Sequence, residues 1–280
     1  MAHLSLIRIH NCLIAALAVA VGQYLSMTSQ SHHPNIEAMA AAFFVCGFGN
    51  VINDLSDIAA DRINHPRRAL PSGRVSPAQA KTTAAMFLII SLALLFGLTL
   101  SGKIILIMAV VLLVLYNAGL ARVVLARNLA VAVLGGMVFL LGGTPTGAAA
   151  VLTLPGPLVP AVLAFIMHLA RELIKDMADL DGDRSTGRRT APMVFGSRIT
   201  VMAGGILIMA AIALSLAMFF VGWFDSTYLY VVLALVIIPA GAQMIWLAFE
   251  PGPDRCRTVA SFMRLEMLAG MVALVIGRNY

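Results

Sequence analysis

Residues 53–61 read Asn-Asp-Leu-Ser-Asp-Ile-Ala-Ala-Asp, and residues 176–183 read Asp-Met-Ala-Asp-Leu-Asp-Gly-Asp. Both stretches carry three aspartates at the spacing i, i+3 and i+7. The first trio is Asp54, Asp57 and Asp61, and the second trio is Asp176, Asp179 and Asp183. A helix has about 3.6 residues per turn, so each trio is predicted to lie on one face of a helix. Asp181 is predicted to lie off that face.

Long apolar segments surround both trios. Of the 280 residues, 60% are hydrophobic and 11% are charged, whereas a soluble domain carries roughly 25% charge. Nine apolar runs have about the 20 residues that cross a bilayer as a helix. They cover about 9–28, 36–56, 79–101, 103–121, 128–148, 154–176, 200–222, 226–249 and 259–277. We therefore predict an all-α, polytopic membrane protein. About nine transmembrane helices would form one bundle, and one domain (1–280), around a cytoplasm-facing, aspartate-rich cavity.

Basic residues gather on one side of this predicted topology. Arginines and lysines flank the first span and the junctions after the second, fourth, sixth and eighth spans, and only Lys103 and Arg278 fall on the opposite side. Because cytoplasmic loops carry an excess of Lys and Arg, we expect a multi-pass protein of the cell membrane. Its N-terminus and both aspartate-bearing loops would be cytoplasmic. The net charge of +6 is then a topology signal, and no soluble basic domain exists to bind nucleic acid.

Three functions suit two carboxylate clusters at a membrane surface. The first is Mg²⁺-mediated binding of a diphosphate, because Mg²⁺ prefers a few carboxylates together with phosphate oxygens. The second is ion or proton transport, since intramembrane carboxylates mark ion pathways. The third is a structural role in which aspartates pair with the arginines of nearby loops. A transporter more often places its charges near the membrane midplane at broken helices, and a structural role does not require the same spacing twice.

Polar neighbours of the trios favour the diphosphate. Asn50 and Asn53 lie one helical turn apart beside the first trio and are suited to phosphate oxygens or metal-bound water. Cationic side chains are predicted near the same membrane plane, where arginine binds phosphate in bidentate fashion. These cations are Arg68, Arg122, Arg171 and Lys175. We therefore predict that all six aspartates are catalytic Mg²⁺ ligands and that these side chains bind substrate.

Both motifs resemble the signatures of the UbiA-type intramembrane prenyltransferases. Asn-Asp-x-x-Asp-x-x-x-Asp at 53–61, with the segment 62–73 after it, is similar to their first signature. Arg-Glu-Leu-Ile-Lys-Asp at 171–176, with Asp179 and Asp183, is similar to their second. One departure is Ala69, where many members have proline. Within the family, Asp-Arg-Ile-Asn-x-Pro at 61–66 is most similar to the digeranylgeranylglyceryl phosphate synthases.

The resemblance implies a reaction and its participants. An isoprenyl diphosphate, geranylgeranyl diphosphate above all, would bind through Mg²⁺, and its tail would lie in an apolar tunnel within the lipid bilayer. A hydrophobic acceptor, geranylgeranylglyceryl phosphate above all, would attack the allylic cation. The alternative acceptors are the aromatic acids, chlorophyllide or haem of other family members. Arg8 and Asn11 are candidates to hold a polar acceptor head, and Tyr116 is a candidate to face the cation. No obligate protein partner is evident.

Overall fold

The computed structural model describes residues 2–27, 34–119, 123–185, 187–249 and 252–279. Within these ranges the chain is helical, and its β-structure is limited to one isolated bridge between Phe224 and Arg278. The chain divides into two compact units. The first contains residues 1–123, 137–158 and 181–188, and the second contains residues 124–136, 159–180 and 189–280.

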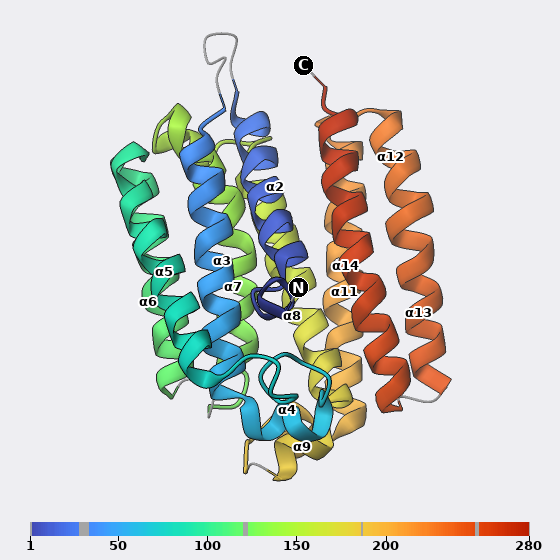
Figure 1. The fold of residues 1–280 in the computed structure, drawn as a ribbon. Coiled ribbons are helices and arrows are strands. Elements are labelled where there is room, and N and C mark those ends of the chain that lie inside the picture. Colours follow the sequence, from blue (N-terminus) through green and yellow to red (C-terminus); the bar gives the residue numbers. More distant parts are fainter. Residues whose placement is uncertain (1, 28–33, 120–122, 186, 250–251, 280) are drawn as a thin grey trace. The chain divides into compact units, whose positions relative to one another are not determined.

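The first unit is built around helix α3 (Figure 1). Helix α3 contacts α2, α5 and α6, and a shared apolar cluster includes Phe48, Val51 and Leu70. The helices of this unit are α1 (Ala2–Leu6), α2 (Ile9–Ser26), α3 (Ile36–Ser56), α4 (Ile58–Asn64), α5 (Pro77–Ala93), α6 (Leu100–Ala118), the end of α7 (Ala126–Gly143) and α9 (Leu180–Ser185). Short 3-10 turns follow α5 and α7, at Leu94–Gly97, Thr144–Thr146 and Ala149–Leu152.

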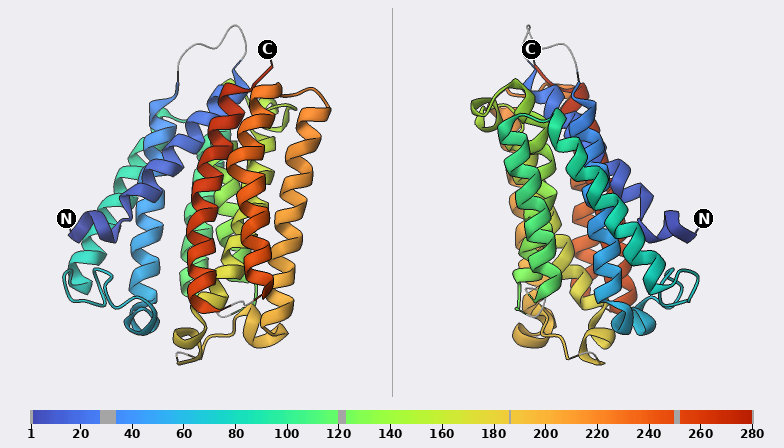
Figure 2. Two further views of the ribbon diagram at one scale, coloured as in Figure 1. Left: turned by 90° about the vertical axis from the view of Figure 1, so that its right-hand side faces the viewer. Right: turned by 60° about the vertical axis from the view of Figure 1, so that its left-hand side comes forward.

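The second unit contains the start of α7 and the helices α8 (Leu158–Ala178), α10 (Ala191–Phe195), α11 (Ser197–Phe220), α12 (Ser226–Val232), α13 (Ile238–Phe249) and α14 (Pro253–Ile276). A π-helical segment, Leu233–Ile237, joins α12 to α13. Helices α11, α13 and α14 run side by side (Figure 2). Their apolar core includes Leu247 of α13 and Met263 of α14, and it also takes Ile174 from α8.

Sequence signals explain where several helices begin. Ser76 caps α5 through a reciprocal pair of hydrogen bonds with Gln79, and Pro77 occupies the first helical position, where its missing N–H is not needed. Asn35 caps α3 by accepting a hydrogen bond from the backbone N–H of Ala38 at 2.7 Å. Helix α4 ends at Asn64, just before His65-Pro66, because the residue before a proline disfavours helical geometry.

Eight helical segments of the described chain are long and apolar enough to cross a membrane. Their ends lie within six residues of the ends of eight of the nine predicted spans. The prediction of about nine spans is therefore approximate. The remaining predicted span is α8, a helix of 21 residues whose second half carries Arg171, Glu172, Lys175 and Asp176. These charges distinguish it from the other long helices.

Large apolar side chains cover the outside of the spans. Phe96 is 90% exposed, Phe249 is 83% exposed and Phe220 is 78% exposed. Such side chains suit contact with lipid tails, and the helices satisfy their own backbone hydrogen bonds as a spanning segment requires. The chain is a multi-pass membrane protein.

Small residues let helices approach closely inside the first unit. At Gly142, on α7, a Cβ atom would lie 2.2 Å from the backbone oxygen of Val19 on α2. Any larger residue there would force the two helices apart. Membrane helices use glycine in this way because close backbone approach increases van der Waals contact.

Candidate functional site

Each aspartate trio spans a break between two helices. Helix α3 ends at Ser56, Asp57 lies at the junction, and α4 begins at Ile58. Helix α8 ends at Ala178, Asp179 follows it, and α9 begins at Leu180. The prediction that each trio lies on one continuous helix is therefore wrong. Aspartate favours helix ends over helix interiors because its short carboxylate competes for backbone donors.

The six aspartates are all buried, with exposed fractions between 1% for Asp183 and 9% for Asp179. Asp181, between them in sequence, is exposed. This exposure agrees with the prediction that Asp181 lies off the face shared by Asp176, Asp179 and Asp183. Buried carboxylates are costly without partners, so their contacts indicate how the structure stabilises them.

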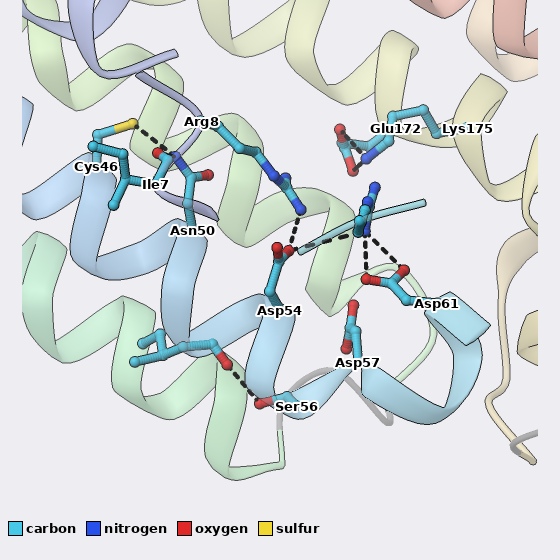
Figure 3. Close-up of polar contacts among 12 residues, drawn as sticks. Ile7, Arg8, Cys46, Asn50, Asp54, Ser56, Asp57, Asp61, Glu172 and Lys175 are labelled. Carbon is cyan, nitrogen blue, oxygen red and sulfur yellow. Dashed lines mark hydrogen bonds and ion pairs between the residues drawn. The ribbon is translucent and has the colours of Figure 1, made fainter. Parts of the chain in front are cut away.

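Two arginines bind the ends of the first trio. Arg8, which precedes α2, donates a hydrogen bond to Asp54 (Figure 3). Arg68 binds both oxygens of Asp61, at 2.7 and 2.6 Å, and its Nη1 lies 3.9 Å from Oδ1 of Asp54. The predicted substrate-binding residues Arg8 and Arg68 therefore lie beside the same two carboxylates.

A third arginine contacts one aspartate from each trio within the first unit. Arg188 forms an ion pair with Asp57, and its Nη1 lies 3.6 Å from Oδ1 of Asp183. The structure thus brings Asp57 of the first trio and Asp183 of the second trio to one guanidinium group. Sequence reasoning assigned Arg188 only a topological role. Its place in an arginine-rich loop after the second motif was the sole signal.

Asp176 lies in the second unit and has a partner from α7. The side-chain amide of Asn128 donates a hydrogen bond to Oδ2 of Asp176 at 3.0 Å, and Asn128 is 2% exposed. The other oxygen, Oδ1, is buried and has no hydrogen-bond partner within the described residues. Sequence reasoning missed Asn128, because no spacing links it to Asp176, 48 residues away.

Glu172 binds the two predicted phosphate-binding cations of α8. Lys175 Nζ lies 3.0 and 2.9 Å from the two oxygens of Glu172, and Arg171 Nη1 lies 3.0 Å from Oε1 (Figure 3 draws the Lys175 pair). Arg171 also donates from Nε to the backbone oxygen of Ala260 on α14 at 2.8 Å. Sequence reasoning gave Glu172 no role, although its i, i+3 spacing to Lys175 is that of a helical ion pair.

The remaining predicted substrate-binding residues fall in different environments. Asn50 donates to the backbone oxygen of Ile7 at 2.9 Å and so anchors the segment before α2 (Figure 3). Asn53 has a buried side-chain oxygen that lacks a hydrogen-bond partner in the described part of the chain. Tyr116 is buried on α6 and Asn11 is half-buried on α2. Arg122 lies outside the described residues.

The aspartates suit Mg²⁺, although no three His, Cys, Asp or Glu side chains converge on one point within the described ranges. Mg²⁺ is usually bound by one or two carboxylates together with phosphate oxygens and water rather than by an all-protein cage. Oδ1 of Asp176 and the side-chain oxygen of Asn53 are buried acceptors to which no described residue donates a hydrogen bond. Such atoms require a cation or a water molecule to offset their burial.

Known proteins resemble this chain over nearly its whole length. Residues 12–267 match the UbiA prenyltransferase family. Digeranylgeranylglyceryl phosphate synthase of Methanoculleus marisnigri is 35% identical over 277 residues, which cover 98% of this chain and 97% of that protein.

Solved structures give the same result. A structure of digeranylgeranylglyceryl phosphate synthase in membranes is 30% identical and has a TM-score of 0.72, over 99% of this chain and 97% of that chain. A UbiA homologue from Archaeoglobus fulgidus bound to GPP and Mg²⁺ is 16% identical. Its TM-score is 0.67, over 99% of this chain and all of that one. The eight spanning helices, the paired aspartate motifs and these matches lead to one conclusion: the chain belongs to the UbiA prenyltransferase family.

Proposed function

We propose that this prenyltransferase moves a geranylgeranyl group from its diphosphate to the hydroxyl of geranylgeranylglyceryl phosphate, in the synthesis of ether lipids. The similarity to digeranylgeranylglyceryl phosphate synthases over 98% of the chain supports this acceptor. The proposed donor rests on the buried carboxylates and the arginines beside them. The carboxylates suit a metal cation, and the arginines suit the diphosphate that the cation would bind. The whole chain would act as one catalytic domain, with its N-terminus and both motif loops on the cytoplasmic side.

Both trios are proposed to hold Mg²⁺. Asp176 would contribute its unpartnered oxygen, and Asn128 would keep that carboxylate in place. Asp54, Asp57, Asp61, Asp179 and Asp183 would supply the other ligands. When bound, Mg²⁺ neutralises the diphosphate and stabilises it as a leaving group.

Cationic side chains would hold the rest of the diphosphate. Arg68 binds Asp61 through Nη1, and a guanidinium group has several N–H donors, so it can bind a carboxylate and a phosphate together. Arg171 and Lys175 would likewise bind phosphate oxygens while they stay paired with the carboxylate of Glu172. Asn50, Asn53 and Arg122 would complete the donor site. The allylic C–O bond breaks and its electron pair leaves with the diphosphate. The acceptor oxygen then forms the new C–O bond and loses its proton to solvent.

Arg8 and Asn11 are proposed to bind the polar head of the acceptor, and Tyr116 is proposed to face the allylic cation. Arg8 contacts Asp54 and is part-exposed, so it would reach from the donor site toward an acceptor phosphate. If so, Arg8→Ala raises the KM for a phosphorylated acceptor more than the KM for the donor. Equal changes in both constants would remove Arg8 from the acceptor site.

In the decisive experiment, the purified protein is incubated with labelled geranylgeranyl diphosphate as the donor. The acceptor is either geranylgeranylglyceryl phosphate or an aromatic acid. We expect product with the lipid phosphate only, and we expect an excess of chelator to abolish it. Asp54→Ala should lose turnover, whereas Asp254→Ala, at an exposed residue outside both motifs, should keep it. Turnover in chelator would refute the metal dependence, and product with the aromatic acid alone would refute the acceptor.

A further inference from the structure

A hydrogen bond joins helices α4 and α9. Asn64 is the last residue of α4, and its side-chain oxygen accepts a hydrogen bond from the backbone N–H of Gly182 on α9 at 3.1 Å. The two residues are 118 positions apart in sequence, and both belong to the first unit. Figure 1 shows the two short helices next to each other.

The contact requires glycine on one side. A Cβ atom on residue 182 would lie 2.3 Å from Nδ2, 2.5 Å from Cγ and 2.6 Å from Oδ1 of Asn64. All three atoms lie beyond the Cβ of Asn64. The side chain of Asn64 therefore occupies the space that any larger residue at position 182 would need.

The contact lies beside an aspartate on each helix. Asp61 is three residues before Asn64, and Asp183 is the residue after Gly182. Both aspartates are buried. Asn64 itself offers no carboxylate, and its oxygen already accepts the backbone donor of Gly182.

A second contact joins the same two parts of the chain. Arg188, just after α9, pairs with Asp57 at the junction of α3 and α4, and lies 3.6 Å from Asp183. This contact is electrostatic and uses the carboxylates themselves, so a bound cation would compete with it. The bond between Asn64 and Gly182 uses no carboxylate. It can persist when the aspartates bind metal.

We propose that Asn64 and Gly182 are positioning residues that fix α9 against α4 and thereby set the separation of Asp61 and Asp183 for metal binding. The inference rests on the proposed function, because it assigns a purpose to the spacing of the proposed Mg²⁺ ligands. Residues that hold metal ligands in place without binding the metal themselves typically contribute about 10–100-fold to metal affinity. A shift of the order of 0.5 Å is enough to weaken a site of this kind.

A double-mutant cycle tests the proposal. Asn64→Ala removes the acceptor, and Gly182→Ala inserts a methyl group into the space that the Asn64 side chain fills. Each single variant should weaken metal binding about tenfold. In the double variant the two changes should not add, because Asn64→Ala removes the very atoms that the new methyl group would meet. Gly270→Ala is the matched control, since a Cβ at residue 270 meets no atom within 4 Å.

Two readouts separate positioning from general damage. The first is Mn²⁺ binding in the presence of an unreactive prenyl diphosphate analogue, followed by electron paramagnetic resonance without turnover. The second is the Mg²⁺ concentration that gives half-maximal prenyl transfer, compared with kcat at saturating Mg²⁺. We expect the half-maximal concentration to rise about tenfold in each single variant, with kcat at saturation changed much less. The unfolding temperature without metal should stay within a few degrees of wild type.

Three outcomes would overturn the inference. Single variants that bind Mn²⁺ as wild type does would show that the contact does not position the ligands. Losses that add in the double variant would show that the two residues act independently. A wild-type protein that neither binds Mn²⁺ with the analogue nor transfers a prenyl group would overturn the proposed function, and this inference with it.

Discussion

Arginine side chains stabilise the buried carboxylates of the first unit. Asp54 is 2% exposed and Asp61 is 4% exposed, and an ionised carboxylate in such a place is costly without a cation. Arg8, Arg68 and Arg188 supply that charge. Each arginine reaches its carboxylate from a different part of the chain. The carboxylates are therefore tied to the loop ends as well as to the helices that carry them.

Asp181 and Asp183 provide a test with neighbouring residues of the same type. Asp181 is exposed and Asp183 is 1% exposed beside Arg188. We expect Asp181→Asn to keep most prenyl transfer and Asp183→Asn to lose at least about tenfold, because only Asp183 is placed to act as a ligand. Initial rates at saturating Mg²⁺ and both substrates measure the difference. A variant of Asp181 as damaged as that of Asp183 would contradict the assignment.

Glu172 is expected to matter for stability. It is 3% exposed and holds both Arg171 and Lys175, so Glu172→Gln would leave two cations without their anion. Breaking a fully buried ion pair costs roughly 3–5 kcal/mol, and part exposure of the cations reduces this to about 2 kcal/mol. The unfolding temperature in detergent should fall by about 5 °C.

The exposed pair of Asp254 and Arg257 is the control for Glu172. The side chain of Asp254 is 97% exposed and that of Arg257 is 46% exposed, at 3.0 Å. Exposed pairs contribute little, so Asp254→Asn should leave the unfolding temperature unchanged. An equal change in both variants would show that burial does not strengthen the Glu172 contacts.

Residue types were easier to predict than residue contacts. The carboxylates could be singled out because their spacing repeats in the sequence, and the cations because they fall near the same predicted membrane plane. Asn128 and Arg188 could not be assigned in the same way, because each meets its aspartate through tertiary folding and without a local pattern. Glu172 has a helical i, i+3 spacing to Lys175, and this spacing could have predicted the ion pair, which sequence reasoning did not assign.

At the scale of single elements, the two motifs share one plan. In each, a long helix ends just before the middle aspartate and a short helix carries the last one. The apolar runs 36–56 and 154–176 predict where the long helices α3 and α8 lie, but they do not predict the short helices that follow each break. The i, i+3, i+7 pattern is the same with or without a break, so the spacing alone does not predict one.

Helix packing in the first unit gives a prediction at Gly142. Gly142→Ala would place a Cβ atom 2.2 Å from the backbone oxygen of Val19, so α7 and α2 would have to separate. Overpacking of this kind costs about 1–3 kcal/mol. The unfolding temperature in detergent is expected to fall by several degrees.

Gly241→Ala is the matched control for Gly142. Residue 241 is also inside a spanning segment, Ser226–Phe249, but a Cβ there meets no atom within 4 Å. Alanine is the better helix former, so this variant should be as stable as wild type or slightly more stable. A similar loss at both positions would mean that helix propensity, and not close packing of α2 and α7, sets the result.

At the scale of the whole molecule, hydropathy was the strongest signal. Span boundaries followed from it because a lipid-facing helix must be apolar over a length fixed by the bilayer. The exception is α8, whose charged second half contacts Asn128 of α7 and the backbone of Ala260 on α14. Site residues alone do not blur a span, because α3 carries Asp54 near its end and still has the bounds that hydropathy predicted, Ile36–Ser56. In α8 the charges begin in the middle of the helix, at Arg171.

The distribution of basic residues predicts the orientation of the protein, and two exposed loop residues test it. Ser72 lies in the loop between α4 and α5, and Thr153 lies after α7. The excess of arginine beside Ser72 predicts the cytoplasmic side, and Thr153 is predicted on the opposite side. Single cysteines would be introduced as Ser72→Cys and Thr153→Cys in a variant whose native cysteines are replaced. A membrane-impermeant maleimide should label Thr153→Cys in intact cells, and Ser72→Cys only after the membrane is opened. Labelling in the reverse order would invert the topology and place both aspartate motifs outside the cytoplasm.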